Sequence, residues 1–529
     1  QLIFANGFVI LKESMCMMKG ITLMKVKENN NIFSIFPIIL VTVVVPLLTL
    51  ANRYHAGLSQ NSWFSVGDGA LDFFLYYKSR MMILIGVILL VFIVSTREYS
   101  KELCKLTFCP LYVYAFFVIF SSFYAKNCMF AFFGGYEQFE SMLVILSYLL
   151  IALYSYIIIN DENRLIIFLR FFIFGIFIMS LLGPGQFFGF DFFKTKIGSF
   201  LMSWTEPSVL SRGLKFNFEV GRTYMTLYNP NYVGSYVPLV FPIILACGFY
   251  MKKSWEKGIS FLTATLLILC LVGSGSVTGI ISLLTILLFG GILLLFKYIH
   301  KRKKVLQITL GILLLIGSIL FLCKDSLRKG VQKFSMQTKM EYTIENIITK
   351  SDCVEVTSYG KKYYITDEEE LTVLDENKNP VTPVSFGVYS AEIEDSHKNF
   401  YNGFCIQAGD YKWEFTNKYT EGEYLHCNAF GKLVPCREIE RIGFKNQEHF
   451  ASRRGYIWSR TLPLLRQYVL LGAGPDNFIN VFPNDDYVGM KNNSYDGKMV
   501  TKPHNMYLQI WEQTGAVSLV AFLLFYFLY

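Results

Sequence analysis

The chain has 529 residues, of which 53% are hydrophobic and only 17% are charged, and its formal net charge is +9. Soluble domains carry about 25% charged residues, so this composition excludes an ordinary soluble protein and predicts a polytopic, all-α membrane protein. The positive charge is explained by residues that anchor the cytoplasmic side and by anionic partners, and it requires no nucleic acid.

The first 31 residues are not predicted to span the membrane. They have neither the length of a span nor the order of a signal peptide, and the first residue is Gln rather than Met. We expect this N-terminal tail to be either upstream read-through or a loose segment.

Apolar windows of about 17–25 residues predict ten membrane spans. Nine lie in a membrane domain over residues 32–323, and the tenth, over 506–529, ends inside an apolar run, so we expect at least one further span in the natural protein. The predicted spans are 32–50, 81–96, 108–124, 141–159, 164–182, 232–250, 258–273, 276–296, 305–323 and 506–529.

Lysine and arginine in the short loops predict the orientation of these spans. If every span crosses once, four basic clusters fall on the same side, which is the cytoplasm. The loops 51–80, 183–231 and 324–505 then face outside. The clusters are Lys19, Lys25 and Lys27; Arg97, Lys101 and Lys105; Lys252, Lys253 and Lys257; and Lys297, Lys301, Arg302, Lys303 and Lys304.

The large outer segment 324–505 divides into two parts. Residues 340–445 are predicted to form an inserted, mostly β domain, because strand-like runs at 353–357, 362–366 and 411–415 alternate with Asn and Gly. Residues 446–505 are predicted to lie against the membrane beside the spans, with an amphipathic helix at 453–465. The insert contains four cysteines, which either form two disulfides or remain free thiols: Cys353, Cys405, Cys427 and Cys436.

Three separated motifs resemble the O-antigen ligase and O-antigen polymerase superfamily of membrane glycosyltransferases. The first is Gly-Arg-Thr-Tyr-Met-Thr-Leu-Tyr-Asn-Pro-Asn at 221–231, and the second is Arg-Arg-Gly-Tyr-Ile-Trp at 453–458 with Gly-Ala-Gly-Pro-Asp at 472–476. The third is Pro-His-Asn-Met-Tyr-Leu-Gln at 503–509, followed by Glu512 and Gly515. The resemblance covers about residues 160–529, apart from the insert, which is longer than the usual loop of the family.

This resemblance implies an enzyme that moves a glycan from undecaprenyl-pyrophosphate to an acceptor hydroxyl in cell-surface polysaccharide biosynthesis. It also implies the cytoplasmic membrane of a bacterium, with the active site on the outer face. The acceptor is a lipid or wall polymer if the enzyme is a ligase, or another lipid-linked glycan if it is a polymerase. By the match, Arg222, one of Arg453 and Arg454, and His504 correspond to the functional residues of the family.

The chemistry of these side chains agrees with that role. The guanidinium groups of Arg222, Arg453 and Arg454 are suited to a pyrophosphate, which is already a good leaving group, so neither a metal nor a cofactor is strictly required. His504 either accepts the proton of the attacking hydroxyl, a role typically worth about 10²–10⁴-fold in rate, or binds phosphate in its protonated form. Direct attack on the anomeric carbon would invert its configuration.

Several neighbours are expected to support the site. Asn229 and Asn231 stand before a span and are predicted to be helix caps. Asn505 follows His504, and Gln509 and Glu512 are expected within about two turns of it on the same helix, where Glu512 orients a polar neighbour or faces a wet cavity. Two further features are expected to be structural: Gly472 and Gly474 shape a turn, and the adjacent Asp485 and Asp486 are solvated.

Two rival functions differ in class from a glycosyltransferase. A flippase or transporter of lipid-linked oligosaccharides should have charged or Gly/Pro-broken spans in matching halves. A membrane sensor would use 340–445 as a ligand-binding domain, but no output domain is recognisable at the cytoplasmic face. The spans are largely uncharged and the polar motifs gather on one side, which favours the glycosyltransferase.

Overall fold

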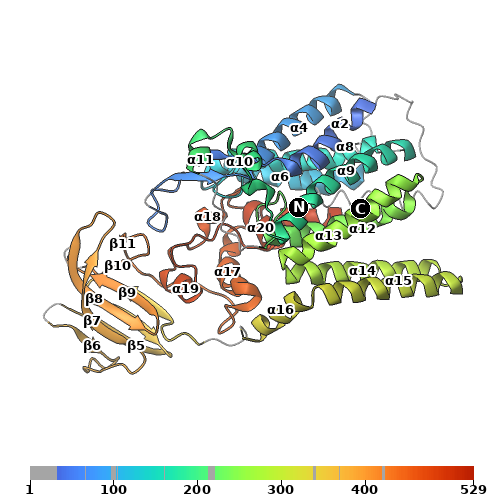
Figure 1. Ribbon diagram of the computed structural model, residues 1–529. Coiled ribbons are helices and arrows are strands. Elements are labelled where there is room, and N and C mark those ends of the chain that lie inside the picture. Colours follow the sequence, from blue (N-terminus) through green and yellow to red (C-terminus); the bar gives the residue numbers. More distant parts are fainter. Residues whose placement is uncertain are drawn as a thin grey trace.

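A helical body and a β-rich region lie at opposite ends of the molecule, with helices α17 to α19 between them (Figure 1). The computed structural model describes residues 32–65, 67–96, 103, 105–159, 161–212, 221–336, 341–367, 370–419 and 423–528. The predicted tail 1–31 lies outside the described residues, and so do Arg97 and Lys101 of one basic cluster.

Within the described ranges, seven helical segments are long and apolar enough to cross a membrane: α4 Tyr76–Ser95, Leu106–Phe123 (η3 Leu106–Phe108 with α6 Cys109–Phe123), α9 Glu162–Phe187, α12 Pro230–Tyr250, α13 Ser254–Ser274, α14 Val277–Lys297 and α15 Arg302–Leu322. Three shorter apolar stretches accompany them: Phe36–Leu47, α8 Met142–Ile158 and α21 Ala516–Leu528. The first of these consists of α2 Phe36–Ile39, a π-helical turn η2 Leu40–Val44 and α3 Val45–Leu47, after η1 Ile32–Ile35. Each predicted span overlaps one of these segments, so a mostly helical membrane protein is confirmed, while the number of crossings stays a prediction.

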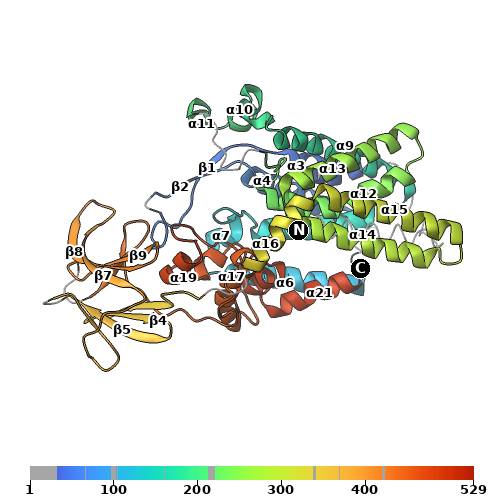
Figure 2. The same cartoon turned by 60° about the horizontal axis from the view of Figure 1, so that its bottom comes forward.

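The tenth predicted span is not one helix, which corrects the sequence interpretation. It consists of α20 Met506–Thr514 and α21, separated at Gly515, whose φ is 96°. A Cβ atom at this position would lie 2.2 Å from the carbonyl oxygen of Leu470. The helix is therefore interrupted where a loop from another part of the sequence approaches it closely. Such a contact cannot be predicted from the apolar composition of the segment. Figure 2 shows α21 beside α6.

The three loops predicted to share one side of the membrane contact one another. The first contains the antiparallel hairpin of β1 Asn52–His55 and β2 Gly69–Asp72. The backbone N–H of Ala51 donates to the carbonyl of Met202, at 2.6 Å, in the second loop. The side chain of Asn428, in the third loop, donates to the carbonyl of Ser62, at 3.0 Å. Short helices complete the second loop: η4 Phe192–Lys194, α10 Lys196–Ser203 and α11 Pro207–Arg212. Another short helix, α7 Cys128–Phe133, follows α6.

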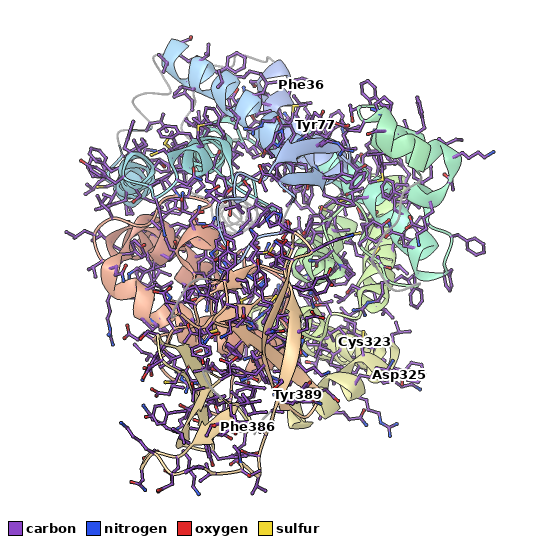
Figure 3. All side chains as sticks on the ribbon, turned by 90° about the vertical axis from the view of Figure 1, so that its left-hand side faces the viewer. Phe36, Tyr77, Cys323, Asp325, Phe386 and Tyr389 are labelled. Atoms are coloured by element: carbon purple, nitrogen blue, oxygen red, sulfur yellow. The ribbon has the colours of Figure 1, made fainter. Side chains whose placement is uncertain are left out.

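The β-rich region follows α16 Lys324–Met336 and contains two antiparallel sheets. Their shared core includes Trp413, Phe404 and Phe415, each at most 1% exposed. Figure 3 shows Phe386 and Tyr389 in this region, at the opposite end of the molecule from Phe36. The sheets are ordered β3-β4-β5-β6 and β11-β10-β9-β8-β7, with β3 Asn346–Thr349, β4 Val354–Ser358, β5 Lys361–Thr366, β6 Thr372–Leu374, β7 Gly387–Glu394, β8 Phe400–Ala408, β9 Tyr411–Thr416, β10 Leu425–Cys427 and β11 Leu433–Val434.

The three strand-like runs seen in the sequence are thus strands β4, β5 and β9. All four cysteines of the region are free thiols in this structure. The boundaries of the insert and its location outside the membrane stay predictions.

The segment after the sheets contains α17 Phe450–Leu464, η5 Leu465–Gln467, α18 Phe478–Val481 and α19 Tyr487–Asn492. Ala451, Ser452 and Arg453 have positive φ, so the regular part of α17 begins at Arg454. This agrees closely with the amphipathic helix predicted from residue 453. Tyr456 and Ile457 of α17 pack on Phe478 in a small core of their own.

Candidate active site

His504 lies in a loop that is fixed at both ends. Its neighbour Asn505 caps α20, because the Asn505 Oδ1 atom accepts hydrogen bonds from the backbone N–H groups of Tyr507, at 3.0 Å, and Leu508, at 3.3 Å. On the other side, the indole N–H of Trp458 donates to the carbonyl of Pro503 at 2.9 Å. The structure therefore ties the third motif to α17, which carries the second.

Lys502 connects the same loop to the first motif. Its ammonium group donates to the Tyr232 hydroxyl at 2.6 Å and lies 5.3 Å from the centre of the Tyr232 ring. It also lies 5.9 Å from the ring of Tyr228. Both tyrosines stand at the start of α12, so residues far apart in the sequence meet here. Sequence reasoning missed Lys502, although its position two residues before His504 was an available signal.

The environment of His504 favours the neutral imidazole. Its pKa is lowered to about 4, chiefly by burial and further by the positive charges of Lys502 and Arg454. The residue as a whole remains exposed to solvent, so the ring is accessible to a ligand. A neutral ring at pH 7 has a nitrogen lone pair with which to accept a proton.

The two neighbouring arginines of α17 lie in different surroundings. The charge of Arg454 acts on His504. The charge of Arg453 instead acts on His449, whose pKa is lowered mainly by burial, and the Arg453 Nε atom is buried without a hydrogen-bond partner. Of the two, Arg454 is the arginine whose charge lowers the pKa of His504, while the charges of both act on Tyr495.

Arg222 is held at the turn between α13 and α14. The backbone of the next residue, Thr223, donates to the carbonyl of Gly273 at 3.0 Å, and its hydroxyl donates to the carbonyl of Gly183 at 3.1 Å. The Arg222 Nη1 atom lies so close to Gly275 that a Cβ atom there would be 2.0 Å away. No hydrogen bond joins Arg222 to His504 or Arg454 within the described part of the chain, so the structure fixes Arg222 but does not bring it into contact with them.

The cations of this region share one property. Among the described residues, no ion pair within 4.0 Å involves any of Arg222, Arg453, Arg454 or Lys502. Cations that form no ion pair are available to an anionic ligand. The charge of Lys502 also acts on the carboxyl groups of Glu137 and Asp476, where it opposes the rise in pKa caused by burial.

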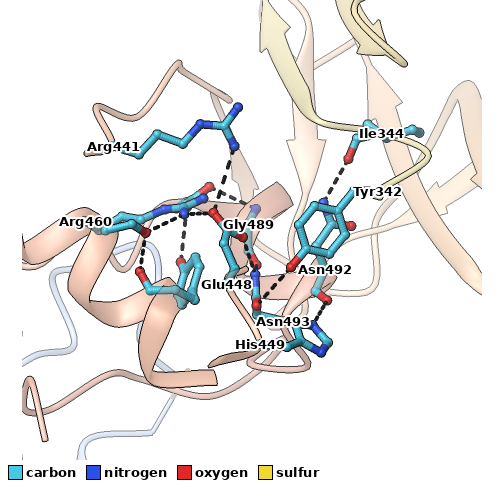
Figure 4. Close-up of polar contacts among 12 residues, drawn as sticks. Tyr342, Ile344, Arg441, Glu448, His449, Arg460, Gly489, Asn492 and Asn493 are labelled. Carbon is cyan, nitrogen blue, oxygen red and sulfur yellow. Dashed lines mark hydrogen bonds and ion pairs between the residues drawn. The ribbon is translucent and has the colours of Figure 1, made fainter. Parts of the chain in front are cut away.

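Arg460, on the same helix, is in the opposite situation (Figure 4). It is 4% exposed, and it donates to Asp486 Oδ2 at 3.0 Å and to Glu448 Oε1. Glu448 Oε2 accepts from the Asn493 side chain at 2.8 Å, and the Tyr456 hydroxyl donates to Asp486 at 3.1 Å. Each charged group in this cluster has a partner of opposite charge, so the cluster stabilises the fold.

The expectation that Asp485 and Asp486 are both solvated is wrong for Asp486. Asp486 is 8% exposed and pairs with Arg460, whereas Asp485 pairs with the more exposed Arg437 at 2.7 Å. The sequence offers no sign of this, because Arg460 approaches from a helix 26 residues away.

The second motif supports the site through its backbone. Gly474 has a φ of 96°, and the N–H groups of Ala473 and Gly474 donate to the carbonyls of Glu512, at 2.8 Å, and Gln513, at 3.0 Å. The two glycines therefore shape a turn against α20, as predicted. A Cβ atom at Gly472 would lie within 2.0 Å of the α20 backbone.

Asp476, in the same motif, organises the loop 134–141. Its Oδ2 atom accepts hydrogen bonds from the backbone N–H groups of Gly135 and Glu140, each at 2.8 Å, while its Oδ1 atom is buried without a partner. Burial raises the pKa of Asp476 to about 7, and the hydrogen bond from Gly135 opposes this shift. Sequence reasoning did not single out this residue.

The predicted supporting residues divide into several cases. Asn229 caps α12, with its Oδ1 atom accepting from the N–H of Asn231 at 2.8 Å. Asn231 is therefore not a cap, because Asn229 already takes that position, and its side chain is exposed. Gln509 donates to Glu140 at 3.3 Å. Glu512 is fully buried and neither carboxylate oxygen has a hydrogen-bond partner in the described structure, so it orients no neighbour.

The comparisons with known proteins agree with this arrangement. The family model described as O-antigen ligase matches residues 262–523, a range that includes Arg453, Arg454 and His504. No curated protein and no solved structure gives a match. The family indicates a membrane glycosyl-transfer role in polysaccharide biosynthesis. The match and the meeting of the motifs around His504 together lead to one conclusion: the chain belongs to the O-antigen ligase superfamily.

Proposed function

We propose that the protein is a membrane glycosyltransferase of the O-antigen ligase type. It transfers a glycan from undecaprenyl-pyrophosphate to an acceptor hydroxyl on the outer face of a bacterial cytoplasmic membrane. The observation that supports this most strongly is that the loop of His504 is joined to α17 through Trp458 and to Tyr232 through Lys502, so that the motifs with the unpaired cations meet at the histidine loop. Such a set suits a reaction in which a hydroxyl loses a proton while a pyrophosphate leaves.

The cations provide the donor site in this proposal. Arg454 and Lys502, which act on His504, bind the pyrophosphate near the sugar, and Arg222 and Arg453 extend the positive region. As the bond from the anomeric carbon to the phosphate oxygen breaks, the electron pair stays on the pyrophosphate. Fixed guanidinium and ammonium groups stabilise this developing charge without reorganising.

His504 acts as the general base. As the acceptor oxygen attacks the anomeric carbon, the imidazole takes the hydroxyl proton, and the configuration at that carbon is inverted. A bound pyrophosphate offsets the charges of Lys502 and Arg454, and this raises the proton affinity of His504 when the donor is present. The neutral ring in the absence of the donor supports the role of base over that of a permanent phosphate ligand.

The acceptor separates the two forms of this activity. A ligase adds the glycan once to a lipid or wall polymer, whereas the alternative, a polymerase, adds it repeatedly to another lipid-linked glycan. Transport of lipid-linked oligosaccharide is the more distant alternative. Among the described residues, the cations of the site that form no ion pair lie at helix ends and in loops rather than within the spans, and this favours transfer over transport.

The test is a reconstituted assay with a defined undecaprenyl-pyrophosphate oligosaccharide as donor. We expect His504→Ala to lower the transfer rate by about 10²–10⁴-fold and Arg222→Ala to weaken use of the donor. A ladder of products indicates a polymerase and a single addition a ligase. Appearance of the donor on the opposite leaflet without a new glycosidic bond would instead indicate transport.

Matched controls come from residues of the same type outside the site. His397 is exposed in the β-rich region, and Arg466 forms an exposed ion pair with Glu440 at 2.9 Å. His397→Ala and Arg466→Ala should transfer at the wild-type rate. Full transfer by both His504→Ala and Arg222→Ala would overturn the assignment of the site.

A further inference from the structure

Helix α10, in the loop 183–231, turns an apolar face away from the protein. Four large apolar side chains follow the spacing i, i+3, i+4 and i+7, which places them on one face, and each is at least 50% exposed. They form an outward stripe: Ile197, Phe200, Leu201 and Trp204. On a soluble protein such a stripe faces the core and the opposite face is polar. The reversed arrangement of α10 suits apolar surroundings outside the protein.

The inner side of α10 is anchored, so the outward stripe cannot turn inward. Met202 is fully buried and packs in a small core with Phe74, Phe193 and Tyr224. The carbonyl of Met202 also accepts a hydrogen bond from the backbone N–H of Ala51 at 2.6 Å. The direction of the outward stripe is therefore set by the fold of the loop.

The outward stripe continues an exposed apolar surface of the span α9. One side of α9 and its C-terminal cap exposes large apolar residues at spacings of three and seven, each at least 44% exposed: Phe171, Phe174, Leu181 and Phe188. Phe190, in the turn that leads to α10, is exposed as well. Figure 2 shows α10 and α11 next to one end of α9, at the edge of the helical body. Because α9 is long and apolar enough to span the membrane, this surface leads from the acyl chains to α10.

The residues at the two ends of α10 are typical of a membrane interface. Lys194 and Lys196 are exposed directly before the outward stripe, and Trp204 stands at its end. Lysine beside apolar residues attracts lipid phosphates, and Trp prefers the level of the headgroups. With eight residues, α10 is about 12 Å long, which is too short to cross the membrane.

We propose that α10 is an interfacial helix that inserts its outward stripe among the acyl chains of the adjacent leaflet, which is predicted to be the outer one. Lys194 and Lys196 contact the phosphates of the phospholipids. A second copy of the chain fits this surface less well. A stable protein interface buries about 800 Å² on each partner, and one face of a helix about 12 Å long provides only part of that area.

The insertion of α10 sets the height of Arg222 relative to the membrane. Tyr224, two residues after Arg222, packs in the same small core as Met202. Its hydroxyl donates to Asp191 Oδ2 at 2.7 Å, in the segment before α10. A helix fixed in the leaflet therefore holds Arg222 near the headgroups, where the pyrophosphate of a lipid-linked donor lies. This step rests on the proposed function, whereas the insertion itself does not.

Site-specific photo-crosslinking tests the insertion. p-Benzoyl-phenylalanine replaces Phe200 in the full chain, which is reconstituted into nanodiscs of phosphatidylethanolamine and phosphatidylglycerol, illuminated and analysed by intact mass. We expect a phospholipid adduct at Phe200, as at Phe174 in the span α9. The matched control is Phe400, a similarly exposed phenylalanine in β8 of the β-rich region, where we expect no adduct.

Two outcomes at Phe200 would overturn the proposal. One is the absence of a phospholipid adduct. The other is a covalent dimer of the chain as the main product, which would identify the outward stripe as an interface between copies. A second variant, Leu201→Asp, places a charge on the stripe and should abolish the adduct at Phe200, because a carboxylate is costly among acyl chains. An unchanged yield of adduct in that variant would contradict insertion.

The link to Arg222 has a separate readout. In the transfer assay, Leu201→Asp should raise the apparent KM for the undecaprenyl-pyrophosphate donor severalfold and leave kcat close to the wild-type value, while Phe400→Asp should change neither. An unchanged KM together with a lost adduct would contradict only the link to Arg222. A wild type that gives the adduct but transfers no glycan would contradict the proposed function and leave the insertion in place.

Discussion

The two ends of α17 contain arginines in opposite electrostatic settings. Arg460 is buried between Glu448 and Asp486, and its charge is fully paired inside the protein. Arg454, six residues earlier, has no ion pair, and its charge acts on His504. An arginine that is paired and removed from water stabilises the fold, because its loss would leave buried carboxylates without a counter-charge. An unpaired arginine near solvent adds little to stability and remains available to an anion.

Removing Arg460 should have the largest effect on the folded protein. Arg460→Met leaves buried Asp486 without a cation and buried Glu448 with only the more exposed Arg441, at 3.9 Å, which costs about 3–5 kcal/mol. We expect a much lower Tm in detergent and poor recovery of the folded protein. The matched control is Arg466→Met, which removes an exposed pair worth at most about 1 kcal/mol. If Arg460→Met kept the wild-type Tm, Arg460 would not stabilise the fold, and the contrast with Arg454 would be wrong.

Asp476 lies between these extremes, because one of its oxygens has partners and the other has none. Its pKa is raised from an ordinary value near 4 to about 7 in the folded protein. Over that range the folded state binds more protons than the unfolded state, so stability contributed by this group is lost as pH rises from about 4 to 7.

Asp476→Asn should remove this pH dependence. The variant keeps an oxygen that accepts from Gly135 and Glu140 but cannot ionise, so its Tm relative to the wild type should increase between pH 5 and pH 8. The difference in the free energy of unfolding is at most about 4 kcal/mol from the shift in pKa. Thermal melts at several pH values check this, and a constant difference across the range would show that Asp476 does not titrate there.

The contrast also shows what could be predicted from the sequence. Long apolar runs specify helices by their composition, and an Asn such as Asn505 before an apolar helix is a local signal for a cap. Both the helices and this cap could therefore be predicted from the sequence. The pairing of Arg460 and the break at Gly515 depend on residues distant in the sequence. Lys502 stands directly before the third motif, but its importance arises from Tyr232, 270 residues away.

Choosing between adjacent arginines likewise required tertiary structure. The motif gave Arg453 and Arg454 equal standing, and only the fold shows that Arg453 still has a positive φ and that the regular helix begins at Arg454, whose charge acts on His504. The cationic character of the site was thus predictable, while the arginine whose charge acts on the histidine was not.

The arginine pair gives the next prediction. A charge-assisted hydrogen bond is worth about 1.5–3 kcal/mol, so Arg454→Ala should lower kcat/KM for the donor by about 10–150-fold with little change in Tm. Arg453→Ala should have a smaller effect, because its charge acts on His449 rather than on His504. Steady-state kinetics on the two variants, with Tm as a check on folding, tests this order. A larger loss for Arg453→Ala would reverse the assignment.

The smallest expected effect concerns the pH profile. The charge of Lys502 lowers the pKa of His504, so Lys502→Met should raise that pKa. A base with a raised pKa is protonated, and inactive, at a higher pH. The acid limb of kcat/KM should therefore move to higher pH, while the acid limb of kcat, which reports the complex with bound pyrophosphate, should shift less. The control is Lys498→Met, which removes an exposed lysine from the same segment and should leave both limbs in place.

If His504 instead binds phosphate in its protonated form, activity would depend on that proton, and Lys502→Met would extend activity towards higher pH at the alkaline limb. Both limbs would move to higher pH, so the limb that moves, acid or alkaline, distinguishes a proton acceptor from a phosphate ligand.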